Sequence, residues 1–333
     1  MSSRALYLVA LVVGLPFLVS YVVYYGFGTN YTADVFHEEG FREQYESGVY
    51  RYRILGRYTL LGTHAFIESD FIVSRLLRSQ CPDPPAGVQT LDDRADSDFY
   101  TAYFIQNTLF LVLCSIIMYA ILARAPQSER TLKLTLLPLL IGLTQYVVCP
   151  YDTLSYVFIL LTFLLIQRQF RYRMPILLLA LAVSTLVRET AALAIPFFVA
   201  DHWNGISRGE TRRLRQLGLL TGTFLATYLL LRVVLGFNAA FWQNVRLLDN
   251  LLSLRCLLGF LALGIVAYPL AVISASRRKC LVFMLASSPY WLAMLFIAVT
   301  WELRLWVPVW LGLLVLQRLR SSPSGFAATS SGA

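Results

Sequence analysis

The sequence has few histidines, few cysteines and none of the common metal- or nucleotide-binding spacings. Its 333 residues include three His (His37, His64 and His202) and five Cys, and neither a CxxC nor an HExxH spacing occurs. A dedicated zinc site is therefore not expected. A Walker loop following a strand-like run is also lacking, which argues against ATP as the energy source.

Charged residues are scarce as well, at 14%, against 57% hydrophobic residues. These fractions lie outside the range of ordinary soluble domains, and many runs are apolar enough for a bilayer core. We therefore expect an all-α, polytopic helical membrane protein with a single integral membrane domain over residues 1–320. The tail, 321–333, is small and polar and is expected to be disordered and cytoplasmic.

The net charge of +9 does not indicate a nucleic-acid partner. Basic residues occur in short clusters between hydrophobic runs, which is the pattern of cytoplasmic loops, so a polyanion-binding surface is the weaker interpretation. Threading on this basis places about ten spans with both termini in the cytoplasm, as in an integral multi-pass protein of a bacterial inner membrane. The first span is long for a signal peptide and lacks a cleavage site, so it is expected to be retained. The predicted spans are 5–25, 100–122, 134–148, 153–166, 175–187, 191–200, 217–235, 256–274, 281–299 and 305–316.

The most informative spans are the fifth and sixth, which flank Arg188, Glu189 and Thr190. Basic clusters at 168–173 and 208–215 require the same side, so we expect the chain to turn at Arg188 and Glu189. Each arm then has only about 13 residues, or ~20 Å, less than the ~30 Å bilayer core. Such arms are expected to be buried among neighbours, with the turn in a water-filled cavity. The alternative is one long span with the pair at mid-membrane.

This threading makes the charge distribution one-sided. About 16 of the 19 Asp and Glu fall on the non-cytoplasmic side and three on the cytoplasmic side, whereas Lys and Arg divide 12 and 16. Ionisable groups at the ends of apolar spans are costly to place, so this distribution predicts a polar site that opens to the non-cytoplasmic side.

The first outer loop, 26–99, carries the densest group of candidate site residues. Asp34 and Glu38 are four residues apart, on one face if this part is helical, and Glu39 follows directly. Cys81 also lies in this loop, and a disulfide with the outer-side Cys149 and two free thiols are both open alternatives.

An arginine cluster in the same loop precedes an apolar, aromatic-rich stretch. Arg51, Arg53 and Arg57 lead into residues 58–67, which are expected to form an amphipathic helix lying in the membrane interface. A solvated acidic loop with a surface helix would explain the individual charges. Together, however, carboxylates, arginines and an interfacial helix suit a lipid phosphate substrate, since Arg binds phosphate as a fork and a carboxylate can accept a proton from a hydroxyl.

Three further polar segments are predicted on the same side. Asp152 in CPYDT either caps the helix that follows or belongs to the site. Arg188 and Glu189 are either a structural pair in a tight turn or part of a cavity. Glu302 and Arg304 lie in WELRLW.

The tryptophans of this last segment, Trp301 and Trp306, are interpreted as interfacial anchors. On that interpretation the role of WELRLW is structural rather than chemical.

The pattern resembles the GT-C superfamily of polytopic glycosyltransferases. The resemblance is carried by the long first outer loop with acidic residues, the interfacial helix with Arg, the short hairpins and the segments DVFHEEGF, YRYRILGR, YDTLSY, RETAALAIP and WELRLWVPV. It covers most of the chain as topology and short motifs rather than as a diagnostic signature. Two departures are the lack of a soluble domain after the spans and an ambiguous match to the superfamily's first-loop carboxylates.

The resemblance implies transfer of a sugar, with inversion, from a polyprenyl-phosphate-linked donor to a glycan, lipid or protein acceptor, at an active site facing the periplasm. A first-loop carboxylate would act as base while arginines balance the leaving phosphate. It implies no certain cofactor, and since metal dependence varies within the superfamily, a divalent metal is an open alternative. The implied site residues are the candidate bases Asp34, Glu38 and Glu39, and the substrate- or phosphate-binding residues Arg51, Arg53, Arg57, Asp152, Arg188, Glu189, Glu302 and Arg304.

Two other classes stay open. A surface-polysaccharide polymerase or ligase usually has its large loop late in the chain, whereas the largest loop here comes first. A flippase or transporter of lipid-linked glycans should show internal repeats and charges at the bilayer midplane. No repeat is evident, and Arg232 in LLLRVV is the main midplane charge, which is expected to snorkel outward.

Overall fold

The described residues form an all-helical bundle, as expected. A computed structural model describes residues 3–26, 41–42, 45, 49–69, 94–145, 152–236, 245–272 and 274–318, and within these ranges helices are present and strands are not. The first-loop carboxylates Asp34, Glu38 and Glu39, the cysteines Cys81 and Cys149, and the tail 321–333 lie outside the described residues.

The described elements occur along the chain in the following order. The first span is built from α1 (Ser3–Val9), the π-helical η1 (Ala10–Gly14), α2 (Leu15–Tyr21) and the π-helical η2 (Val22–Gly26). The later elements are η3 (Val49–Tyr52), α4 (Ile54–Ser69), α6 (Arg94–Ile121), α7 (Gln127–Gly142), α8 (Asp152–Gln167), α9 (Arg173–Val187), η5 (Glu189–Leu193), α10 (Ala194–Asp201), α11 (Trp203–Ser207), α12 (Thr211–Leu235), α14 (Leu247–Leu252), α15 (Leu254–Val272), α16 (Arg277–Ala286), α17 (Ser288–Ile297), η6 (Leu303–Leu305) and α18 (Val307–Leu316).

Several of these helices could cross a membrane. By length and composition, four qualify among the described residues, and a fifth crossing results if α16 and α17, bent by 44°, form one span. Three shorter apolar helices, α8, α9 and α18, accompany them. The four are Ser3–Tyr25, Phe99–Ile121, Thr211–Leu235 and Leu254–Val272.

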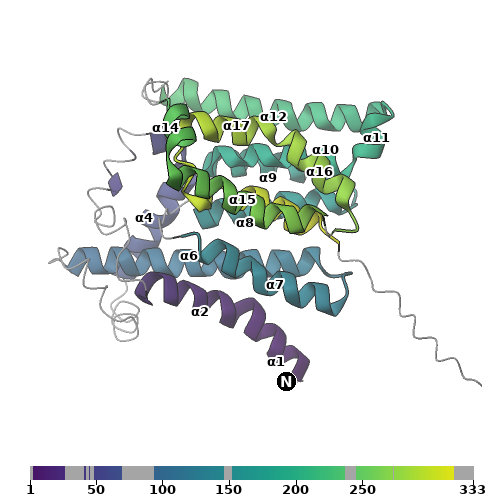
Figure 1. Cartoon of the computed structure of the whole chain (residues 1–333). Coiled ribbons are helices and arrows are strands. Elements are labelled where there is room, and N and C mark those ends of the chain that lie inside the picture. Colours follow the sequence, from purple (N-terminus) through teal and green to yellow (C-terminus); the bar gives the residue numbers. More distant parts are fainter. Residues whose placement is uncertain are drawn as a thin grey trace, which may run out of the picture.

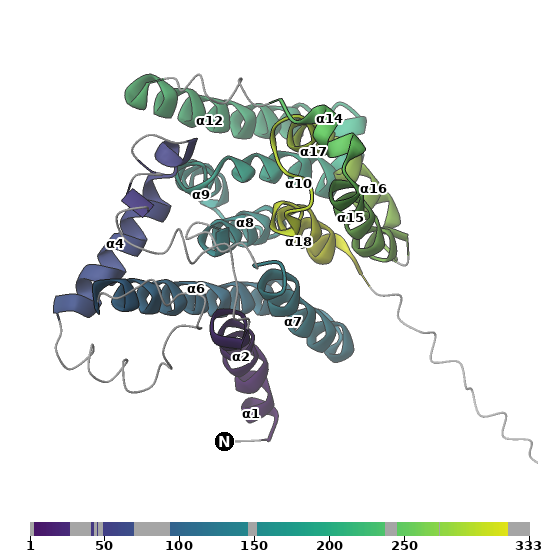
Figure 2. The ribbon, with the colours of Figure 1, turned by 60° about the vertical axis from the view of Figure 1, so that its left-hand side comes forward.

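The long helices lie roughly side by side. In two views α12 forms one edge of the bundle and α1–α2 the opposite edge, with α8, α9, α10 and α18 between them (Figure 1 and Figure 2). Helix α4 lies across one end, packing on α6 and α9, while η3 reaches α12. We call this end the α4 end and the other the distal end.

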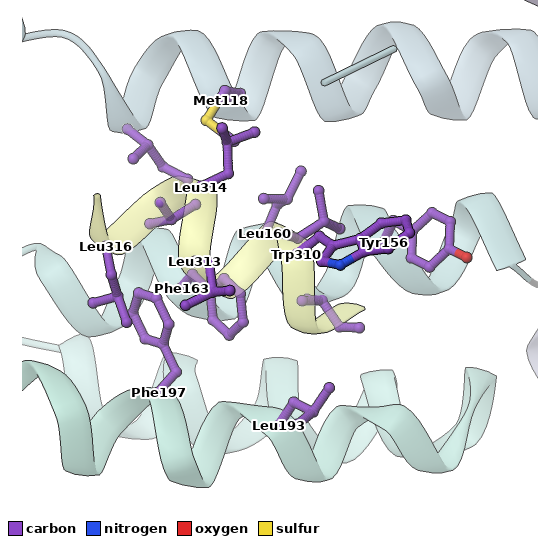
Figure 3. Packing of buried hydrophobic residues seen from close by; sticks show 14 of the residues in the cluster. Met118, Tyr156, Leu160, Phe163, Leu193, Phe197, Trp310, Leu313, Leu314 and Leu316 are labelled. Carbon is purple, nitrogen blue, oxygen red and sulfur yellow. The ribbon is translucent and has the colours of Figure 1, made fainter. Parts of the chain in front are cut away.

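The core surrounds α18, which is apolar on all sides, the pattern of a fully buried helix. All ten of its residues are buried. Leu314 points toward Met118 of α6, while Leu316 lies beside Phe163 of α8 and Phe197 of α10 (Figure 3). The Phe163 and Phe197 rings stack with centroids 3.8 Å apart.

The chain turns at Arg188, as the flanking basic clusters predicted. Arg188 is extended (φ −165°, ψ 147°), which ends α9 before η5 and α10 begin. Arg173 at the start of α9 interacts electrostatically with Asp201 at the end of α10. Since the start of one helix meets the end of the other, the two arms are antiparallel, and the alternative of one continuous span is wrong for this structure.

Several helices begin earlier than the apolar runs suggested. Helix α7 begins at Gln127 and α12 at Thr211, whereas the expected spans began at 134 and 217. Polar side chains can occupy the first turns of a helix when they have partners there. In α7, buried Lys133 binds Glu129 one turn earlier (Nζ–Oε1 2.8 Å), so a predicted loop residue is helical.

The expected span 281–299 is broken rather than continuous. Helix α16 ends at Ala286, and α17 starts after Ser287 with Pro289 in its first turn. Proline has no N–H to donate and its ring clashes with the preceding turn, so the helix restarts in a new direction.

Basic side chains at the distal end cap helices. The Arg130 guanidinium donates to the carbonyls of Leu122, Ala123 and Ala125 beyond the end of α6, and Arg168 Nη2 donates to Ala120 O (2.7 Å). The last carbonyls of a helix lack intrahelical partners and carry partial negative charge, which these cations satisfy.

Gly259 allows α15 to contact the segment that leads to WELRLW. A Cβ at Gly259 would collide with the carbonyl oxygen of Thr300, whereas a Cβ at Gly264 of the same helix would meet nothing within 4 Å. We expect Gly259→Ala to lower the free energy of unfolding by about 1–3 kcal/mol through overpacking. Gly264→Ala should leave it unchanged or raise it by up to about 1 kcal/mol, as helix propensity requires. Thermal unfolding in detergent would compare them, and equal behaviour of both variants would contradict this contact.

Candidate functional site

Charged side chains from distant parts of the chain meet at the α4 end. They come from the first loop, the start of α8, the turn after α9, the end of α12 and η6, so the four predicted outer-side segments do converge. We call this set the charged cluster: Arg53, Asp152, Arg188, Glu189, Arg232, Glu302 and Arg304.

Asp152 is the buried centre of one half of the cluster. It is fully buried, one carboxylate oxygen pairs with Arg188, and the other accepts from Arg304 Nη1 at 2.9 Å. A buried charge is tolerated only when it is paired, and here each oxygen has its own arginine. Asp152 therefore holds the side chains of two arginines in place. A residue that only caps the start of α8 would not need these two ion pairs.

Glu302 and Arg304 pair with each other at the edge of this half. Arg304 donates to Glu302 Oε2 through Nη2 (2.6 Å) and Nε (3.0 Å). Two phenols hold the backbone here, since Tyr156 donates to Arg304 O (3.0 Å) and Tyr290 to Leu305 O (2.7 Å). Arg304 is thus held at both its side chain and its backbone.

Trp306 is not the interfacial anchor that its sequence context suggested. It is fully buried, its indole N–H donates to Thr300 O (3.0 Å), and its ring lies 5.5 Å from that of Phe260 in α15. The reason is that residues 300–306 fold back against α15, which turns the indole into the core.

A buried asparagine sets the path of this returning segment. Asn250 of α14 donates to Leu295 O and Ala298 O (both 2.7 Å), and its Oδ1 accepts from the backbone N–H (3.3 Å) and hydroxyl (3.2 Å) of Thr300. Every hydrogen-bonding group of the amide is used, so the segment before WELRLW has one favoured position.

Glu189 is the most accessible of the three carboxylates in the cluster. Its side chain is 30% exposed; Oε2 lies 3.5 Å from Arg53 Nε, and Oε1 lies 3.8 Å from Arg232 Nη2. These distances exceed that of a direct N–H···O hydrogen bond. One alternative for this turn was a structural ion pair between Arg188 and Glu189. Instead, Arg188 pairs with Asp152, and Glu189 pairs with Arg53 and Arg232.

The charge state of Glu189 follows from its surroundings. Burial raises the pKa of Glu189, but the nearby charge of Arg53, a bond to its own backbone and the charges of Arg188 and Arg232 outweigh burial and leave the pKa below its usual 4.5. The ion pairs of Glu189 therefore persist above that pH, and are lost only as the pH falls through the lowered pKa.

Arg232 belongs to the cluster but was not among the expected site residues. Its guanidinium carbon lies 3.4 Å from the ring centroid of Tyr228 and 4.5 Å from that of Tyr52. The Tyr52 hydroxyl donates to Gly236 O (2.7 Å), joining η3 to the end of α12. The sequence feature that could have identified Arg232 is its position as an isolated Arg in an apolar run, because such a residue in a membrane span usually has a functional role.

The remaining predicted site residues either lie beside the cluster or fall outside the described residues. Arg51 and Arg57 flank Arg53, and each lies against the tyrosine that follows it (5.9 and 5.7 Å to the ring centroids). Over the described ranges, three or more His, Cys, Asp or Glu side chains do not gather as a metal site would require.

Helix α4 has apolar residues on two faces. Leu60 and Ile67 are buried against the bundle, whereas Tyr58 and Phe66 are about 60% exposed on the other face. The segment after the arginines is thus helical as predicted, and it presents an outward aromatic face as well as an inward one.

No family model, curated protein or solved structure matches this chain.

Proposed function

We propose that the protein is a membrane glycosyltransferase of the GT-C type. It would move a sugar from a polyprenyl-phosphate-linked donor to a glycan, lipid or protein acceptor. The charged cluster carries this proposal: arginines and carboxylates from five segments meet at one end of an apolar bundle, beside helix α4, which follows an arginine-containing segment and has an exposed aromatic face. A lipid phosphate requires both features together, cationic groups for its head and an apolar surface for its chain.

The proposed orientation places the α4 end on the non-cytoplasmic side of a bacterial inner membrane. About ten helical segments would traverse the bilayer, several of them short and shielded by neighbours, with both termini in the cytoplasm. Supporting this, the distal end holds the clusters 168–173, 208–215 and 277–279, which follow the preference of Lys and Arg for the cytoplasmic side.

The proposed reaction is a single displacement with inversion. A first-loop carboxylate, Asp34, Glu38 or Glu39, takes the proton of an acceptor hydroxyl as its oxygen bonds to the anomeric carbon. The bond between that carbon and the phosphate oxygen breaks, and its electron pair leaves with the phosphate. Arginines of the first loop stabilise this developing charge, while Asp152 keeps Arg188 and Arg304 in place.

The proposal can be tested in a strain lacking the gene. We expect a polyprenyl-phosphate-linked sugar to accumulate while one envelope glycan loses that sugar, and the wild-type gene to reverse both changes. Arg53→Gln should fail to restore the glycan because it removes a phosphate partner. Arg246→Gln, exposed at the same end and outside the cluster, should restore it. Mass spectrometry of lipid-linked sugars and glycans provides the readout, and unchanged profiles of both in the deletion strain would refute the assignment.

A flippase for lipid-linked glycans is the second candidate. The break between α16 and α17, with a 44° bend, favours it, because broken helices line the substrate paths of many transporters. Proteoliposomes separate the two functions. Sugar transfer to an added acceptor supports the enzyme, and movement of the intact donor between leaflets without transfer supports the flippase.

A further inference from the structure

The charged cluster has a closed half and an open half. In the closed half, Asp152 and Glu302 hold Arg188 and Arg304, and Asp152 is fully buried. In the open half, Glu189 lies between Arg53 and Arg232, at 3.5 and 3.8 Å, and is 30% exposed. The carboxylate of Asp152 is therefore buried and bonded directly to its arginines, whereas that of Glu189 is partly exposed and lies farther from Arg53 and Arg232.

The two arginines of the open half are placed by different parts of the fold. Arg53 lies between η3 and α4, and Arg232 is in the last turn of α12. Arg232 is held between the rings of Tyr52 and Tyr228, and Tyr52 is bonded to Gly236. Its guanidinium is thus positioned by packing on aromatic rings and does not depend on Glu189 for its place.

Glu189 occupies the space between them with one oxygen toward each arginine. We propose that Arg53 and Arg232 form a phosphate clamp, that Glu189 acts as its internal counter-ion, and that the phosphate of a substrate displaces Glu189 from it. A phosphate group has more charge and more acceptor oxygens than a carboxylate, and it matches the arginine fork on two sides. The partial exposure of Glu189 gives its side chain access to water when it leaves.

This clamp rests on the proposed function in taking a lipid-linked phosphate as its ligand, but its test measures binding and not sugar transfer. Purified protein in nanodiscs would be titrated with polyprenyl monophosphate and, separately, with inorganic phosphate. We expect Glu189→Gln to bind polyprenyl monophosphate about tenfold more tightly, because a like charge next to the ligand is removed. Arg53→Gln and Arg232→Gln should each bind it about tenfold more weakly.

Asp249→Asn is the matched control. It removes one negative charge from an exposed position on α14 at the same end, and should change the affinity less than twofold. Circular dichroism and size-exclusion profiles identify any variant that fails to fold, and the opposite direction expected for Glu189→Gln keeps the test decisive, since misfolding cannot tighten binding.

The outcomes separate cleanly. Tighter binding of both ligands by Glu189→Gln supports a general phosphate clamp, and tighter binding of the lipid phosphate alone supports a clamp for the lipid head group. Unchanged or weaker binding of both overturns the clamp, as does an equal gain in Asp249→Asn. Failure of sugar transfer with these binding changes intact would refute the glycosyltransferase and leave the clamp.

Discussion

Asp152→Asn is expected to lower the free energy of unfolding by about 3–5 kcal/mol, the loss seen when one partner of a buried ion pair is removed. The variant takes away the charge that Arg188 and Arg304 share, and both arginines are about 95% buried. Their displacement would also disorder the turn after α9 and the η6 segment, so sugar transfer should be lost even in the fraction that stays folded.

Thermal and denaturant unfolding in nanodiscs would measure the change. Asp249→Asn makes the same chemical substitution at an exposed position of the same end and should alter stability by less than about 0.5 kcal/mol. A fully stable Asp152→Asn protein without transfer activity would contradict the structural role and indicate that Asp152 acts in the chemistry.

Loss of the proposed catalytic base should have the largest effect on rate. Among Asp34→Asn, Glu38→Gln and Glu39→Gln, we expect one to lower kcat about 10²–10⁴-fold, the usual contribution of general base catalysis. The KM for the donor should change little in that variant, because donor binding is assigned to the arginines.

The three variants serve as controls for one another, since they remove equal charge from neighbouring positions. Initial rates with a radiolabelled lipid-linked sugar, measured as a function of pH, would give the comparison. Rates within twofold of wild type in all three would rule out a first-loop base.

Much of the fold was predictable because apolar runs and charge clusters act locally. The turn at Arg188 follows from basic clusters on both flanks, and the convergence of Arg53, Asp152 and Arg304 follows from that turn. The break at Ser287 could also have been predicted, since Pro289 is best tolerated in the first turn of a helix and so indicates that a new helix begins there. It was missed because hydrophobicity continues across the break.

The partners within the site were not predictable in the same way. Pairing of Asp152 with Arg304 depends on how two helical segments pack whose residues are 152 positions apart, and no local pattern encodes it. Arg232 was expected to snorkel to the surface, but the rings of Tyr52 and Tyr228 hold it in the cluster. Trp306 was misassigned for a related reason, since a tryptophan at the end of an apolar run suits both a membrane surface and a core.

The position of α18 also constrains how the protein is made. This helix lies at the centre of the bundle, yet the ribosome synthesises it after the helices against which it packs, among them α7, α8, α15 and α16. We therefore expect the earlier helices to associate only loosely until α18 fills the space between them. The core is then completed when α18 packs into it. The residue after α18, Gln317, accepts a hydrogen bond from buried Lys133 Nζ through its backbone carbonyl (2.5 Å). The last described helix to be synthesised is thus the one that fills the centre of the bundle.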